Sequence, residues 1–104
     1  MTIQLNADKN LTIHPEYEAQ MSEKLEKELQ RFSEHITRLE VHLSDENGSK
    51  DGHEDKKCSI ECRVEGKPPM ATTDFGNSYD QALNGAVTKL KNALTTMMGK
   101  LKEH

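Results

Sequence analysis

The sequence predicts an α+β two-layer sandwich, with a four-stranded sheet covered on one face by two helices. Three stretches alternate apolar and polar residues at a period of two, which is typical of strands with one buried face. Two longer stretches repeat apolar residues at spacings of three and four, which is typical of amphipathic helices. The predicted order is strand, helix, three strands, helix (β-α-β-β-β-α). Since hairpins link the last three strands, much of the sheet should be antiparallel.

The first strand is predicted over residues 2–6, with Ile3 and Leu5 on its buried face. Pro15 then suits the first turn of a helix, where its missing N–H has no partner to lose. This helix is predicted from residue 16 to about residue 33, because a narrow apolar stripe runs along that stretch and the opposite face is densely charged. The stripe consists of Tyr17, Met21, Leu25, Leu29 and Phe32.

Three strands should follow the first helix. Residues 38–44 and 58–64 alternate cleanly, whereas residues 70–75 form a weaker strand that suits an edge of the sheet. The buried face of this fourth strand is ambiguous between its even-numbered and its odd-numbered residues. Residues 45–57 contain no apolar side chain, which indicates a long solvated hairpin loop. A turn is predicted at residues 66–69, Gly-Lys-Pro-Pro.

The last helix is predicted over residues 78–104, and the rest of the chain is organised around it. Ser78 should cap this helix, and Gln81 three residues later should complete a capping box. Four lysines lie off the apolar stripe and give the helix a cationic outer side. The stripe consists of Tyr79, Leu83, Ala86, Leu90, Leu94, Met97 and Leu101, and the lysines are Lys89, Lys91, Lys100 and Lys102.

Composition limits the class of protein. A chain of 104 residues suits one domain over residues 1–104, and 33% hydrophobic residues suit one thin core. The net charge of −4 argues against a generally basic nucleic-acid binder, although a basic stripe on an acidic surface is compatible with it. No apolar run approaches the about 20 residues that span a bilayer, and the N-terminus lacks the features of a signal peptide. We therefore expect a cytoplasmic protein without a membrane partner.

Neither an enzyme nor a metal protein is indicated. The sequence has no glycine-rich phosphate loop, no HExxH and no GxSxG. Cys58 and Cys62 should face the same side of one strand at about 13 Å from each other, which is too far for a disulfide. Their plain interpretation is a pair of small buried residues, since no CxxC or HxxxH spacing is present. We expect no catalytic residue, no metal, no cofactor and no small-molecule substrate.

Two basic clusters remain as candidate binding residues. Lys24, Lys27 and Arg31 fall at i, i+3 and i+7 of the first helix, and the second cluster is formed by the four lysines of the last helix. If the helices pack side by side, both clusters would project from one surface and could contact phosphates, which require only an array of point charges. The alternative is solvated surface, because glutamates surround the first cluster and lysines near a helix C-terminus are stabilised without a partner.

Four sequence runs, in this order and spacing, resemble the bacterial ribosome hibernation factors. This family includes the short hibernation-promoting factor and the ribosome-associated inhibitor, also called sigma modulation proteins. The matching runs are KLEK (24–27), ITRLEVHLS (36–44), SYDQALNGAVTKL (78–90) and KLKEH (100–104). The resemblance covers essentially the whole chain and implies a fold similar to a double-stranded-RNA-binding domain with an added strand.

The resemblance also implies a function. Members of the family bind the small ribosomal subunit at its 16S rRNA, in the channel used by messenger and transfer RNA, and thereby stop translation and protect idle ribosomes under stress. The chain resembles the short form, and we expect a monomer or a weak homodimer. At positions where the family contacts rRNA the chain has Lys24, Lys27, Lys89, Lys100 and Lys102, and we add the basic neighbours Arg31 and Lys91 from the spacing alone.

Several departures from the family pattern leave an alternative open. Asp80 stands where an aromatic residue is usual, and the loop at 45–57 is long and acidic. Other positions that are often basic or strongly polar hold Asn92, Thr96, Met97 and Met98, and the two methionines could belong to the core or to a protein contact. The alternative is a divergent member that has lost rRNA affinity and acts as a protein-interaction module.

Overall fold

The predicted order of helices and strands is confirmed. The computed structural model describes residues 1–8, 11–45 and 56–102, and the side chains of residues 100–102 lie outside the description. Each strand extends one or two residues beyond an end of its predicted range, and a short 3₁₀ helix follows the first α-helix. The elements are β1 (Thr2–Ala7), α1 (Pro15–Glu28), η1 (Gln30–Phe32), β2 (Ile36–Asp45), β3 (Lys56–Val64), β4 (Met70–Gly76) and α2 (Tyr79–Lys102).

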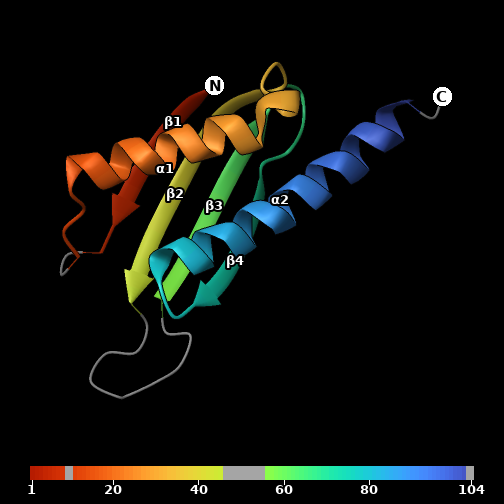
Figure 1. The fold of residues 1–104 in the computed structure, drawn as a ribbon. Helices are drawn as coiled ribbons and strands as arrows, with labels where there is room; N and C mark the ends of the chain where they lie inside the picture. The colour runs from red at the N-terminus through yellow and green to blue at the C-terminus, as the bar shows by residue number, and fades with distance from the viewer. Residues whose placement is uncertain (9–10, 46–55, 103–104) are drawn as a thin grey trace.

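The four strands form one mixed sheet in the order β1-β2-β3-β4. β1 runs parallel to β2 because α1 crosses over between them, whereas the hairpins make β2, β3 and β4 antiparallel. Both helices cover the same face of the sheet (Figure 1). The structure therefore confirms the α+β two-layer fold. None of the described helices has the length and apolar character that crossing a membrane requires.

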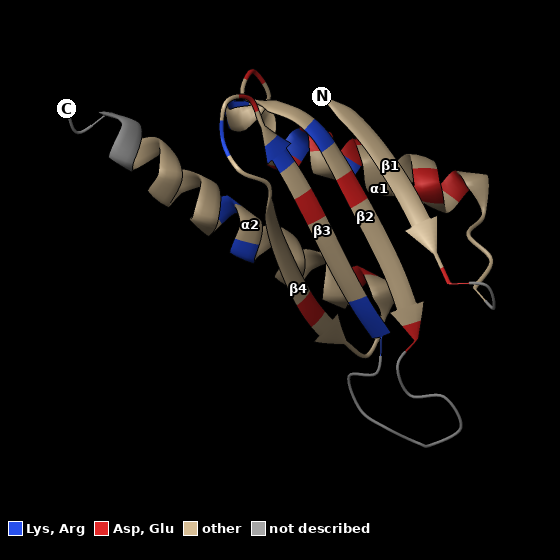
Figure 2. Ribbon diagram, turned by 180° about the vertical axis from the view of Figure 1, so that it is seen from behind, with Lys and Arg blue, Asp and Glu red and all other residues tan. Residues whose placement is uncertain are grey.

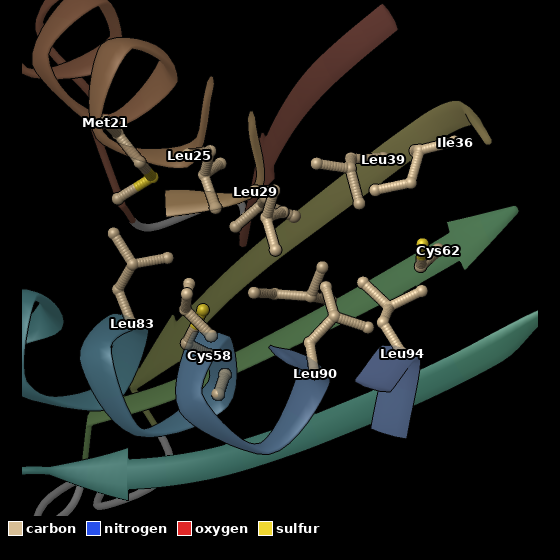
Figure 3. Close-up of a cluster of buried hydrophobic side chains, with 14 of the residues drawn as sticks. Met21, Leu25, Leu29, Ile36, Leu39, Cys58, Cys62, Leu83, Leu90 and Leu94 are labelled. Atoms are coloured by element: carbon tan, nitrogen blue, oxygen red, sulfur yellow. The ribbon is translucent and has the colours of Figure 1, made fainter. Parts of the chain in front are cut away.

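The core lies between the sheet and the helices. The inward residues of β2 and β3 are buried, and so is the predicted stripe of the first helix except Tyr17, which is partly buried. Side chains from both layers meet in Figure 3. α2 buries Ala82 and Val87 in addition to four residues of the predicted stripe, which are Leu83, Ala86, Leu90 and Leu94. Met97 and Met98 are partly buried and pack against this core, which favours the core interpretation of the two methionines over the protein contact.

The two cysteines are free and fully buried, as the sequence predicts. Burial raises the pKa of Cys58 to about 12, with a smaller contribution from Asp74, and burial raises the pKa of Cys62 to about 11. Both groups are therefore neutral thiols at pH 7, and they act as small apolar residues of the core. In the described part of the chain, no group of three or more His, Cys, Asp or Glu residues is arranged to hold a metal ion.

The prediction of one α-helix to about residue 33 is wrong, because α1 ends at Glu28. Leu29 leaves the helical conformation (φ −107°, ψ 15°), and Phe32 N–H donates to Leu29 O at 2.9 Å in the 3₁₀ turn. A 3₁₀ turn places residues i and i+3 on the same side, so Leu29 and Phe32 both stay buried while the chain turns toward β2. The prediction that Arg31 shares one face of the first α-helix with Lys24 is therefore wrong as well, because Arg31 lies in the 3₁₀ turn.

The two ends of the predicted 45–57 loop belong to the sheet. Asp45 pairs with Lys56 and Ser44 pairs with Lys57 across the β2–β3 ladder. Lys56 Nζ also lies 2.8 Å from Asp45 Oδ2. The remainder of the predicted loop, residues 46–55, lies outside the described residues.

The ambiguity of the fourth strand is resolved in favour of the even-numbered residues. Thr72 Oγ1 donates to Ala86 O of α2 at 2.9 Å, while Phe75 is 44% exposed on the other face of the sheet. Asp74 lies against Gly85, where an added Cβ would overlap the carboxylate. The absence of a side chain at Gly85 therefore permits the close approach of α2 and β4.

The capping box at the start of α2 is present with one difference. Gln81 N–H donates to Ser78 Oγ at 3.1 Å, as predicted. Gln81 Oε1 accepts from the backbone N–H of Asn77 at 2.7 Å, whereas the usual return bond goes to the cap residue itself. The box thus gives a partner to one N–H group in the first turn of α2, that of Gln81, and to the N–H of Asn77 before the cap.

Candidate nucleic-acid interface

Two side-chain hydrogen bonds connect α1 and α2, the helices of the outer layer. Tyr17 OH donates to Asp80 Oδ1 at 2.9 Å, and Lys91 Nζ donates to Glu28 Oε2 at 3.2 Å. On each helix the two hydrogen-bonded positions are eleven residues apart, so α1 and α2 run in the same direction with matched register (Figure 1). The sequence analysis required the two helices to pack side by side if their basic clusters were to project from one surface. The structure meets this requirement.

Lys24 and Lys27 lie on the solvent side of α1. Lys24 is partly exposed and Lys27 is exposed, and no carboxylate of the described residues lies within 4.0 Å of either ammonium group. Glu23 and Glu26 are exposed on the same helix and reduce the local potential without forming an ion pair in the described structure. These two lysines are therefore available to an external anion.

Lys89 and Lys91 are held by groups of the protein itself. Lys89 Nζ donates to Thr73 O at 2.9 Å and lies 3.5 Å from Asp74 Oδ1, so this lysine reaches toward the edge strand β4. Lys91 pairs with Glu28 and therefore faces α1. Although both belong to the predicted cluster on α2, their charges point in different directions and already have partners.

The remaining predicted residues lie at the ends of the helices. Arg31 is exposed in the 3₁₀ turn, with its guanidinium carbon 4.9 Å from the centre of the Phe32 ring. Lys100 and Lys102 belong to the last turns of α2, and their side chains lie outside the described residues. The structure thus brings Lys24, Lys27 and Lys91 onto the helical surface and separates Lys89 and Arg31 from them.

A polar groove separates the first halves of α1 and α2, and the sequence analysis did not predict it. Its volume is about 240 Å³, and it is lined by Tyr17, Gln20, Met21, Lys24, Asp80, Leu83 and Asn84. Met21 and Leu83 point toward each other between the two helices (Figure 3). In the sequence, Gln20 directly precedes Met21 of one apolar stripe, and Asn84 directly follows Leu83 of the other. This position next to the stripes was the only feature of the sequence that could have indicated the groove.

Two arginines on the open face of the sheet each lie beside a carboxylate. On β2, Arg38 Nε lies 2.9 Å from Glu40 Oε1, and on β3, Arg63 Nε lies 3.3 Å from Glu61 Oε1. Figure 2 shows the basic and acidic segments interleaved on these two strands. Because each of these arginines has a carboxylate beside it, this face is a weaker candidate for binding a polyanion than the helical face.

Comparisons with known proteins match this chain to one family model and to solved structures of the same fold. The family model described as "Sigma 54 modulation protein / S30EA ribosomal protein" matches residues 6–102. A comparison with curated protein sequences finds no match.

Two solved structures are similar to this fold over nearly their whole length. A ribosomal subunit interface protein from Coxiella burnetii has a TM-score of 0.77 and 14% identity, and the match covers 95% of this chain and 99% of that one. The N-terminal domain of Protein Y from Thermus thermophilus has a TM-score of 0.71 and 20% identity, with 93% and 99% covered. At these identities the likeness shows a shared fold.

Proposed function

Because the chain belongs to the family of sigma 54 modulation proteins and S30EA ribosomal proteins, we propose that it is a ribosome-associated factor that binds the small ribosomal subunit. The observation that carries the proposal is the family match itself, which includes both helices, β2, β3, β4 and the last two residues of β1. In this proposal the protein acts in the cytoplasm as a single domain and catalyses no reaction. It contacts 16S rRNA in the channel used by messenger and transfer RNA, represses translation and promotes hibernation under stress.

The proposed contact surface is the outer side of the helical layer. Lys24 and Lys27 are its centre, because both are accessible and neither has an ion pair within the described residues. Lys91 is paired with Glu28, the residue after Lys27 on α1, and this ion pair must open before Lys91 can bind a phosphate. The complete proposed set is Lys24, Lys27, Arg31, Lys89, Lys91, Lys100 and Lys102, of which the last two are supported by sequence position alone.

Electrostatics supplies the affinity in this proposal. Each lysine that neutralises a phosphate releases condensed counterions, so binding should weaken steeply as salt rises. With few unpaired lysines on the helices, we expect binding that is readily lost above physiological salt. A protein contact through apolar side chains would respond little to salt.

The test is cosedimentation of purified protein with isolated small ribosomal subunits at roughly 0.1 M salt, a concentration at which surface charges still act over about 10 Å. The test variant is Lys24→Gln/Lys27→Gln. The matched control is Arg63→Gln/Lys67→Gln, which removes the same charge from the open face and from the exposed β3–β4 turn. Circular dichroism establishes that each variant is folded.

We expect the wild type and the control to cosediment and the helix variant to remain in the supernatant. Loss of binding by both variants would show that net charge matters and the helical surface does not. A folded wild-type protein that never cosediments would overturn the ribosome proposal. It would favour the alternative, a protein-interaction module, which the internal pairing of Lys89 and Lys91 supports.

A further inference from the structure

The groove between α1 and α2 has a chemistry that a plain phosphate site would lack. Lys24 contributes a positive charge on the α1 side, and Asp80 contributes a negative charge on the α2 side. The amide side chains of Gln20 and Asn84 are exposed along the same groove. A bare phosphate would be attracted by Lys24 and repelled by Asp80, so the groove suits a ligand that carries both an anion and a hydroxyl donor.

The walls of the groove are held in place by the fold. Tyr17 OH donates to Asp80 Oδ1 and fixes the carboxylate at the start of α2. Burial above all, and the Asp80 carboxylate in addition, raise the pKa of Tyr17, so the hydroxyl remains a donor at neutral pH. Met21 and Leu83 are 3% and 1% exposed, and their packing fixes the spacing of the helices beneath the polar side chains.

The polar groups of the groove have free capacity for hydrogen bonds. Across residues 1–8, 11–45 and 56–99, no partner within the protein engages the amide groups of Gln20 and Asn84. Asp80 accepts one bond from Tyr17 and has lone pairs left for a second donor. An amide both donates and accepts, and so does a ribose 2′-hydroxyl, the group that distinguishes RNA from DNA.

We propose that this groove binds the sugar–phosphate backbone of an RNA strand and discriminates ribose from deoxyribose. Lys24 contacts a phosphate, and Asn84, Gln20 and Asp80 form hydrogen bonds with the adjacent 2′-hydroxyl. This inference rests on the proposed function and deepens it, because it assigns sugar recognition to side chains that are not part of the lysine array. Recognition through the sugar also compensates for the small number of unpaired lysines.

The test uses fluorescence anisotropy with two labelled duplexes of the same sequence, one RNA and one DNA, each of about 16 base pairs, a length that lets a protein span successive grooves. The variants are Gln20→Ala, Asn84→Ala and Lys24→Gln. The matched control is Asn92→Ala, which removes an exposed amide from α2 outside the groove. The introduced residues, Ala and Gln, are good helix formers. All variants are compared at one low salt concentration.

We expect the wild type to bind the RNA duplex more tightly than the DNA duplex. Asn84→Ala and Gln20→Ala should each weaken RNA binding by about fivefold, the size of one lost hydrogen bond, and leave DNA binding unchanged. Lys24→Gln should weaken binding to both duplexes, because phosphate is common to them. Asn92→Ala should change neither affinity.

Three outcomes would overturn the inference. The first is a wild type without RNA preference, and the second is an equal loss in Asn84→Ala and Asn92→Ala. The third is an Asn84→Ala variant that cosediments poorly with small subunits but keeps its RNA preference, because the groove would then contact a ribosomal protein. If the protein binds the subunit but does not prefer RNA, only the proposal of ribose recognition by the groove is contradicted. If it prefers RNA but does not bind the subunit, only the proposed function is contradicted.

Discussion

The lysines of α1 and those of α2 lie in the same helical layer but differ in what surrounds them. Lys24 and Lys27 have no ion pair within the described residues, whereas Lys89 and Lys91 each lie beside a carboxylate of the protein. A lysine that is already paired must give up that contact before it neutralises a phosphate. The number of lysines in a sequence therefore overstates the charge available for binding.

The size of this difference follows from exposure. The side chains of Lys91 and Glu28 are 39% and 40% exposed, and those of Lys89 and Asp74 are 56% and 34% exposed. Ion pairs this accessible to water contribute only about 0–1 kcal/mol each. The internal partners should therefore reduce the contribution of Lys89 and Lys91 to RNA binding without abolishing it.

The largest expected effect comes from removing the lysines in pairs. Each phosphate contact accounts for about 0.9 in the slope of log K against log salt. One contact therefore raises the affinity at 0.1 M salt by about eightfold relative to 1 M salt. Lys24→Gln/Lys27→Gln should thus lower affinity for the small subunit by about sixtyfold and the slope by about two. Lys89→Gln/Lys91→Gln should have a clearly smaller effect on both. A salt titration of subunit binding measures these slopes, and equal losses would remove the difference between the helices.

The second prediction concerns the approach of α2 to β4, on which the position of Asp74 beside Lys89 depends. An alanine at Gly85 would overlap the Asp74 carboxylate and would also lie 3.0 Å from Asp74 Cβ, so the strand or the helix must shift. We expect Gly85→Ala to lower the free energy of unfolding by about 1–3 kcal/mol, measured by urea denaturation.

Gly99→Ala is the control for this substitution. A Cβ at Gly99 has no atom within 4 Å among the described residues, and the residue is exposed in α2. Alanine there should raise stability by up to about 1 kcal/mol through helix propensity. If both substitutions stabilise the protein, close packing at Gly85 does not hold Asp74 against the helix.

The sequence was sufficient for the features that depend on periodicity. The stripes through Leu25 and Leu90 and the alternation around Val41 and Ile60 correctly predict which faces are buried. The end of α1 could not be predicted, because burying both Leu29 and Phe32 is compatible with an α-helix and with a 3₁₀ turn. The spacing in the sequence therefore placed Arg31 on a face of the first α-helix, although this helix ends before Arg31.

The candidate site was predicted less completely than the fold, for a different physical reason. Lys91 and Glu28 are 63 residues apart in the sequence, and Tyr17 and Asp80 are separated by the same number. Such contacts depend on the relative position of two helices on a sheet, and no local pattern encodes this position. The same applies to the groove, whose polar residues come from both helices.

The smallest effect is expected from releasing a single paired lysine. Glu28→Gln keeps the shape of the side chain and removes the charge that holds Lys91. Lys91 then becomes equivalent to Lys24, so affinity for the small subunit should rise by a few fold and the salt slope should grow by no more than about 0.9. The gain is limited because the released ion pair is itself weak. A salt titration of subunit binding on the purified variant measures both quantities.

A rise in affinity alone would not identify this mechanism, since removing any glutamate lowers the repulsion between the protein and RNA. Glu26→Gln separates the two causes, because Glu26 is exposed on α1 and forms no ion pair within the described residues. A general field effect predicts similar gains for both variants. Release of Lys91 predicts that the salt slope increases for Glu28→Gln and remains constant for Glu26→Gln. Equal slopes would mean that Lys91 contributes the same to subunit binding whether or not it is paired with Glu28. Any difference between the lysines of the two helices would then result from their positions and not from their ion pairs.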